Sequence, residues 1–313
     1  MFRNLSTVGL PLSGRPSELI ELALSFGFDA MDIDLLDFQQ QAEAFGIPHA
    51  RRLMVSARLK SGTFHLPVDL GADDATFEAG LAALPKRLEF AAAAEAVRAV
   101  ATVAPASDEH SFKDLFERYR RRLNDVGDLL AQHGMMLGLN VRPEAEARAN
   151  AANQFIHSFE GLVGLVAVAH DRIGAIADSW VFHVAGESPD LVASLPKGRL
   201  VEVRLSDAPR DVAAADLTAA QRLMPGDTGV ISSSALLQRA KAAGFEGPVT
   251  PWADRSNLVG RGREKIVRLA GERLEAAWKE AGLPIVPRWF TPVQRDHLGR
   301  PIGDEAAIPV GIE

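Results

Sequence analysis

Strand-like and helix-like segments alternate along most of this chain, and the alternation limits its possible folds more than any other feature. Eight short segments have the composition and periodicity of strands: Leu5–Leu10, Ala30–Leu35, Thr63–Val68, Val97–Ala104, Met135–Val141, Ile173–Asp178, Leu200–Ser206 and Gly247–Trp252. Repeated strand–helix units normally place their strands in parallel, with the helices outside. The pattern therefore predicts an α/β fold, a (β/α)8 barrel over residues 1–282.

The segments between the strands have helical periodicity. The clearest is Phe112–His133, where apolar residues recur every three or four positions. The predicted helices are Pro16–Phe26, Asp74–Ala94, Phe112–His133, Phe159–Ala169, Ser232–Ala243 and Arg263–Ala281. An open, doubly wound sheet is the structural alternative, which is weakened because no GxGxxG motif follows the first strand.

The last segment, Leu283–Glu313, differs in composition from the rest of the chain. It contains the prolines Pro284, Pro287, Pro292, Pro301 and Pro309, and it has no clear periodicity. We expect a C-terminal arm that lies over the barrel or over a neighbouring subunit, and therefore a homodimer. A tail without a fixed structure is the alternative.

Composition excludes several classes of function. Hydrophobic residues make up 47% and charged residues 24% of the chain, as in ordinary globular proteins. The net charge of −7 disfavours a nucleic-acid partner, because phosphate binding requires basic surface. With 0 cysteines, the chain has neither disulfides nor thiolate chemistry. No apolar run has the length of a membrane span or a signal peptide, so we expect a cytoplasmic protein without a membrane partner.

The stretch LVEVRLSDAP places charged residues where a barrel strand should face the interior. Val201, Val203 and Leu205 alternate with Glu202 and Arg204, so the strand has one apolar and one charged face. In a barrel the apolar face packs against the helices, and the charged face points inward. Two interpretations stay open: Arg204 binds a ligand, or the two residues form a buried ion pair without one.

Other polar residues occur at or near the ends of successive predicted strands, where barrel active sites lie. We predict that ligand binding involves His65, Asn140, His157, Arg204, Arg222 and Trp252. The candidates for catalysis are Glu202, Asp178 and His183. Histidine suits proton transfer near neutral pH, although for each histidine a packing role is the alternative.

Several segments together resemble the xylose isomerase-like barrels of the sugar (phosphate) isomerase/epimerase superfamily. They are GTFHLPVDL, TVAPASDEHSF, NQFIHSFEGL, GAIADSWVFHVAGESPDL, VEVRLSDAP, LMPGDTGVI, GFEGPVTP and LEAAWKEAGL. The resemblance extends from about Leu5 to about Leu283. It implies a TIM barrel that binds or acts on a small carbohydrate or keto-sugar at the C-terminal mouth.

The resemblance also implies a divalent metal held by Glu, Asp, His and Glu at the ends of strands five to eight. These positions fall on Asn140, Asp178, Glu202 and Trp252, so only the aspartate is retained. Asn140 and Trp252 cannot exchange a proton near neutral pH. We therefore expect no tightly bound metal and no other cofactor, with Mg²⁺ or Mn²⁺ held weakly by Asn140, Asp178 and Glu202 as the alternative. We expect the Arg204 guanidinium to bond Asp178, Glu202 or an anion instead.

Three functions compete at this point. The first is an isomerase- or epimerase-like enzyme whose metal site is largely rewritten. The second is a non-catalytic pseudoenzyme that serves as a binding or scaffold protein, and the fold alone cannot separate these two. The third, an abasic-site endonuclease, is disfavoured because it needs a histidine-rich zinc cluster and a basic groove. This chain is acidic, and its 8 histidines are scattered.

Overall fold

The computed structural model describes residues 1–285, 294–295 and 301–302. Its main sheet consists of β1 (Phe2–Leu5), β2 (Ala30–Met31), β3 (Lys60–Ser61), β4 (Phe64–His65), β5 (Arg98–Thr102), β7 (Met136–Asn140), β9 (Ile173–Asp178), β10 (Leu200–Leu205) and β11 (Pro248–Pro251). The spatial order is β3-β2-β1-β11-β10-β9-β7-β5-β4, and all pairs are parallel. Because β3 and β4 are consecutive pieces of one chain segment, their pairing with β2 and β5 closes the ring. The predicted barrel is confirmed.

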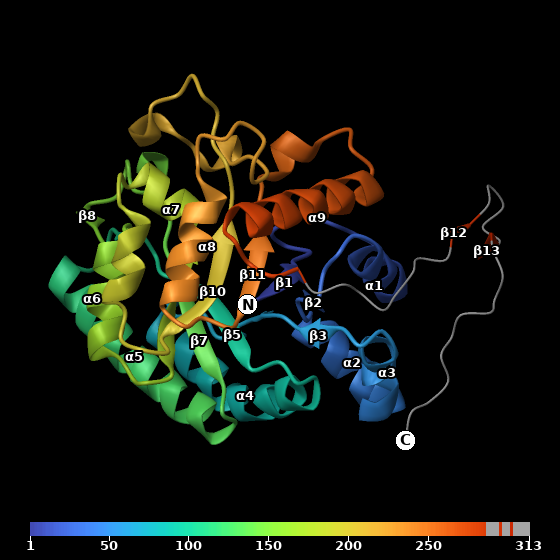
Figure 1. The fold of residues 1–313 in the computed structure, drawn as a ribbon. Coiled ribbons are helices and arrows are strands. Elements are labelled where there is room, and N and C mark those ends of the chain that lie inside the picture. Colours follow the sequence, from blue (N-terminus) through green and yellow to red (C-terminus); the bar gives the residue numbers. More distant parts are fainter. Residues whose placement is uncertain (286–293, 296–300, 303–313) are drawn as a thin grey trace.

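Helices surround this ring (Figure 1). They are α1 (Pro16–Ser25), α2 (Leu35–Phe45), α3 (Ile47–Ser56), α4 (Asp74–Ala93), α5 (Phe112–Gln132), α6 (Phe159–Val168), α7 (Ser179–Val184), α8 (Ser233–Ala242) and α9 (Arg263–Glu280). Every helix predicted from the sequence is present, with its ends within a residue or two of the prediction. In α5 the apolar stripe of Leu115, Tyr119, Leu123, Val126 and Leu130 is buried in the core, as its spacing requires.

The first two predicted strands are misplaced, and local polar contacts explain why. The predicted strand Leu5–Leu10 is wrong, because β1 ends at Leu5 and the chain then turns, with the Leu10 N–H donating to the Ser6 carbonyl at 3.1 Å. The predicted strand Ala30–Leu35 is also too long. Asp34 accepts hydrogen bonds from the Leu36 and Asp37 N–H groups and so begins α2, a helix missed by the sequence prediction.

Shorter elements connect the barrel units on the side where the site lies. Single turns of 3₁₀ helix occur at Ala145–Ala147, Ala214–Asp216 and Ala219–Gln221, and longer ones at Pro189–Ser194 and Arg255–Leu258. A small antiparallel pair joins β6 (Ala106–Ser107) to β8 (Asn153–Gln154). Pro189–Ser194 is the exception, because it packs against α6 and α8. The other loops extend beyond the carboxyl ends of the strands, toward which the arrow of β11 points in Figure 1.

The predicted arm Leu283–Glu313 lies mostly outside the described residues. Of this segment the structure describes 283–285 and the antiparallel pair β12 (Gln294–Arg295) and β13 (Pro301–Ile302). Its contact with a barrel or a second subunit stays a prediction. Within the described part of the chain, no helix is both long enough and apolar enough to cross a membrane.

Candidate functional site

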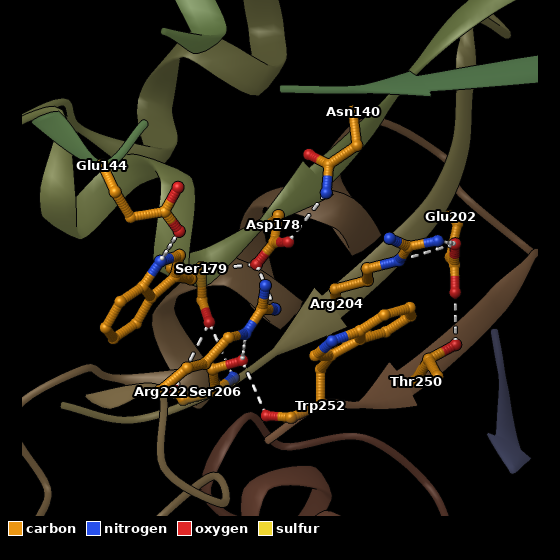
Figure 2. A network of polar contacts seen from close by, with 11 residues as sticks. Asn140, Glu144, Asp178, Ser179, Glu202, Arg204, Ser206, Arg222, Thr250 and Trp252 are labelled. Carbon is orange, nitrogen blue, oxygen red and sulfur yellow. Dashed lines mark hydrogen bonds and ion pairs between the residues drawn. The ribbon is translucent and has the colours of Figure 1, made fainter. Parts of the chain in front are cut away.

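The charged face of β10 points into the barrel and forms an ion pair there (Figure 2). Glu202 Oε2 accepts a hydrogen bond from Arg204 Nε at 3.0 Å, and Arg204 Nη2 lies 2.9 Å from the same oxygen in the ion pair. The Glu202 side chain is 0% exposed and that of Arg204 is 7% exposed, so the pair is shielded from water. Arg204 therefore lies within hydrogen-bonding reach of one of its predicted partners.

Glu202 is also linked through a chain of polar side chains to residues in, or directly after, the next three strands around the ring, β11, β1 and β2. Its Oε1 accepts from Thr250 Oγ1 at 2.5 Å, and Thr250 Oγ1 accepts from Asn4 Nδ2 at 3.0 Å. Asn4 Nδ2 also donates to Asp32 Oδ1 at 2.8 Å. Burial raises the pKa of Glu202, whereas Arg204 opposes this by stabilising the charged form. The negative charge of Asp32 also raises the pKa of Glu202.

A second ion pair stands on the neighbouring strand. Asp178 ends β9 and caps α7 by accepting from the Trp180 N–H at 3.1 Å. Its Oδ1 also accepts from Arg222 Nη2 at 2.7 Å, and its Oδ2 accepts from Asn140 Nδ2 at 3.1 Å. The Asp178 side chain is 0% exposed and that of Arg222 is 11% exposed. The register places Asp178 beside Arg204, so the two ion pairs are neighbours.

Trp252 contacts both arginines. Its ring centroid is 4.0 Å from the guanidinium carbon of Arg204 and 5.6 Å from that of Arg222, distances typical of cation–π contact. Its carbonyl accepts from Ser206 Oγ at 2.8 Å, and Ser206 Oγ accepts from Arg222 Nε at 2.6 Å. Gly9 leaves room for the ring, because a Cβ there would lie 2.6 Å from Trp252 Cε3.

A cavity of about 460 Å³ opens above these residues, a volume suited to a small-molecule ligand. Four of the predicted ligand-binding residues line it: Asn140, Arg204, Arg222 and Trp252. The other charged or aromatic lining residues are Arg142, Glu144, Trp180, Asp254 and Arg255. The charged face of β10 and the polar strand ends thus meet at one mouth of the barrel, as the sequence predicted.

The three predicted histidines stand apart from this cavity lining. His65 is exposed on β4, and His157 places Nδ1 2.7 Å from the Phe155 carbonyl, just before α6. His183 lies on α7, where burial lowers its pKa despite the opposing charge of Asp207. Their roles in binding or proton transfer stay predictions.

Glu144 is a site residue that sequence reasoning missed. Its side chain is 6% exposed and lines the cavity, and its Oε1 accepts from Trp180 Nε1 at 2.8 Å. The available signal was an acidic residue just beyond a strand end, in the sequence NVRPE. Its significance depends on Trp180, which is distant in sequence, so no local pattern reveals it.

The donor set of this mouth does not fit a divalent metal. Asp178 and Glu202, the two carboxylates of the weak metal alternative, are each bonded to a guanidinium, and the Asn140 amide donates to Asp178. A fixed cation beside each carboxylate opposes a second cation there. Among the residues that the structure describes, no group of three or more His, Asp or Glu side chains is placed to hold a metal ion.

Comparisons with known proteins agree with this architecture. Residues 20–282 match the xylose isomerase-like TIM barrel family. A xylose isomerase domain protein from Alicyclobacillus acidocaldarius is 26% identical, with a TM-score of 0.81 over 90% of this chain and 99% of its own. A zinc-binding IolI protein is 16% identical, with a TM-score of 0.75 and the same coverage of 90% and 99%.

A D-psicose 3-epimerase from Clostridium cellulolyticum H10, solved with D-tagatose, is 14% identical, with a TM-score of 0.70 over 90% of this chain and 99% of its own. At this identity the likeness concerns the fold. The comparison with curated proteins yields no match. Because the family match extends over most of the chain and the ring of parallel strands closes, this chain belongs to the xylose isomerase-like TIM barrel family.

Proposed function

We propose that this protein binds a small carbohydrate or keto-sugar at the barrel mouth without a divalent metal. One observation carries the proposal: Arg204 and Arg222 are bonded to the buried carboxylates Glu202 and Asp178. The two carboxylates at the positions where the family resemblance implies a metal are therefore already paired with positive charge. Fixed guanidinium groups can orient sugar oxygens as a cation does, through directed hydrogen bonds.

The cavity supports this proposal through its size and its lining. A volume of about 460 Å³ falls within the range of small-molecule pockets. Amide, carboxylate and guanidinium groups on its wall offer both donors and acceptors, which a polyhydroxylated ligand requires. The D-psicose 3-epimerase with the same fold was solved with a sugar, D-tagatose.

Binding is favoured over metal-dependent isomerisation because the two candidate acids are engaged. Asp178 accepts from Arg222, Asn140 and the Trp180 N–H, while Glu202 accepts from Arg204 and Thr250. A general base must be within reach of the proton that it removes, and neither carboxylate lines the cavity. These contacts therefore favour the pseudoenzyme alternative, in which the protein binds its ligand without catalysis.

Isothermal titration calorimetry in EDTA tests the proposal with pentoses, hexoses, keto-sugars and their acids and phosphates. We expect binding of at least one carbohydrate, with the same affinity after Mn²⁺ is added. Asn140→Ala should weaken binding, whereas the matched variant Asn150→Ala, at an exposed position, should not. A panel in which nothing binds, or binding only when Mn²⁺ is present, would contradict the proposal.

A further inference from the structure

Two buried acceptor atoms at the cavity have no hydrogen-bond partner among the described residues: Asn140 Oδ1 and Glu144 Oε2. Asn140 is 6% exposed and Glu144 is 5% exposed, and both line the cavity. Arg142 Nε lies 3.9 Å from Glu144 Oε2, which is too far for a hydrogen bond. Burying an acceptor without a donor is costly, so both atoms point to a ligand that supplies donors.

The arginines at the cavity retain donors as well. In Arg204 the Nε and Nη2 atoms bond Glu202, and in Arg222 the Nε and Nη2 atoms bond Ser206 and Asp178. No described residue accepts from Nη1 of either guanidinium. Both guanidinium groups contact the ring of Trp252, and both arginines line the cavity.

The charge on the cavity wall is predominantly positive. Arg142, Arg204, Arg222 and Arg255 line it, against the carboxylates Glu144 and Asp254. Asp178 and Glu202 lie behind the wall and bring the formal charge of the whole set to zero, so the excess positive charge belongs to the lining residues. Arg142 and Arg255 are exposed at the rim, where they attract an approaching anion. Burial lowers the pKa of Arg222, and Arg204 acts in the same direction by repulsion, which a bound anion would relieve.

From these contacts we propose that the ligand is a polyhydroxylated anion, a sugar acid or a sugar phosphate. Its anionic group bonds Nη1 of Arg204 and Arg222, and its neighbouring hydroxyl groups donate to Asn140 Oδ1 and Glu144 Oε2. The inference rests on the proposed function, because it specifies which carbohydrate occupies the same cavity. It also assigns Glu144 as a binding residue that distinguishes hydroxylated ligands from simple anions.

Calorimetry with four probes in EDTA tests the ligand class: D-gluconate, D-glucose 6-phosphate, D-glucose and propionate. We expect one or both of the hydroxylated anions to bind at least about tenfold more tightly than D-glucose and than propionate. The stronger of the two identifies a carboxylate or a phosphate as the natural group. Equal affinity for D-glucose, or for propionate, overturns the inference. If D-glucose binds as tightly as the hydroxylated anions, the proposed function still stands. If none of the hydroxylated probes binds, both the inference and the proposed function are overturned.

Variants of the same chain test the assigned atoms. Glu144→Gln keeps an oxygen for Trp180 Nε1 but replaces Oε2 by a donor, so the hydroxylated anion should bind at least about tenfold more weakly. The exposed Glu89→Gln is the control. The double variant Glu202→Gln/Arg204→Gln leaves no unpaired buried charge, and it should weaken binding of the hydroxylated anion by a larger factor than binding of D-glucose. Unchanged affinity in either site variant, with the melting temperature retained, overturns the assignment.

Discussion

At the scale of single residues, the Glu202–Arg204 pair is the contact whose loss should be most damaging. Arg204→Ala leaves Glu202, which is 0% exposed, without its cation. Removing one partner of a buried ion pair typically lowers the free energy of unfolding by about 3–5 kcal/mol. Urea denaturation should show a loss of this size, and a smaller one for Glu202→Gln/Arg204→Gln. A loss below about 1 kcal/mol is typical of exposed surface ion pairs, and it would contradict a buried Glu202–Arg204 pair.

The lowered pKa of His183 predicts a specific pH dependence of stability. Burial holds its pKa below the ordinary value of 6.5, so the folded protein binds this proton more weakly than the unfolded chain. Its contribution to the free energy of unfolding is therefore fully present above 6.5 and lost as the pH falls from 6.5 through the lowered pKa. Urea denaturation between about pH 5 and pH 8 should show a shallower slope for His183→Gln. An unchanged slope would contradict the contribution of His183 to this pH dependence.

The sequence indicated some site residues and could not indicate others, for physical reasons. Glu202 and Arg204 could be predicted because strand alternation alone assigns them to the interior face. Asp178 and Trp252 could be predicted because they end strands or follow them directly. Arg222 was predicted to bind a ligand, but its ion pair with Asp178 was not predictable, because it reaches Asp178 from a loop. Glu144 was not predicted at all, because it gains its role only through Trp180.

At the scale of elements, Asp207 fixes the loop that carries Arg222. This buried carboxylate accepts backbone N–H bonds from Ala208, Thr228, Gly229 and Ile231 at 2.7–2.9 Å. Burial alone would raise the pKa of Asp207, but these bonds outweigh it and lower the pKa. The loop after β10 is therefore tied to the strand end by one side chain.

Asp207→Ala should consequently loosen this loop. The loss of several charge-assisted hydrogen bonds should lower the free energy of unfolding by about 3 kcal/mol and weaken ligand binding through Arg222. Denaturation and calorimetry on the same protein measure both effects. Asp211→Ala, at an exposed position of the same loop, is the control and should change neither. Full ligand affinity in Asp207→Ala would show that the loop holds Arg222 without this anchor.

The six predicted helices and most later strands were placed well because each has a clear periodicity of buried residues, whereas α2, α3 and α7 were not predicted. Helix α5 has a continuous stripe of buried apolar residues, and every residue of strand β9 is buried. The first two strands were misplaced because β1 and β2 are short, and side-chain contacts end them. Ser6 turns the chain after β1, and Asp34 caps α2.

At the scale of the whole molecule, the oligomeric state remains a prediction tied to the proline-rich C-terminal segment. Light scattering on the full chain should give the mass of a dimer, and a chain shortened to residues 1–285 should give a monomer. The physical reason is the apolar, proline-punctuated composition of Leu283–Glu313, which would be buried between subunits. A monomer mass for both proteins would remove the idea.

The central claim, that two arginine–carboxylate pairs replace a divalent metal, is tested most directly by titrating Mn²⁺ into the protein. The protein is purified without a histidine tag, treated with EDTA and measured by calorimetry. We predict no binding tighter than millimolar, because Arg204 and Arg222 hold the carboxylates that a metal would need. Arg204→Ala should then bind Mn²⁺ more tightly. Micromolar binding to the unmodified protein, or no gain in Arg204→Ala, would contradict the account.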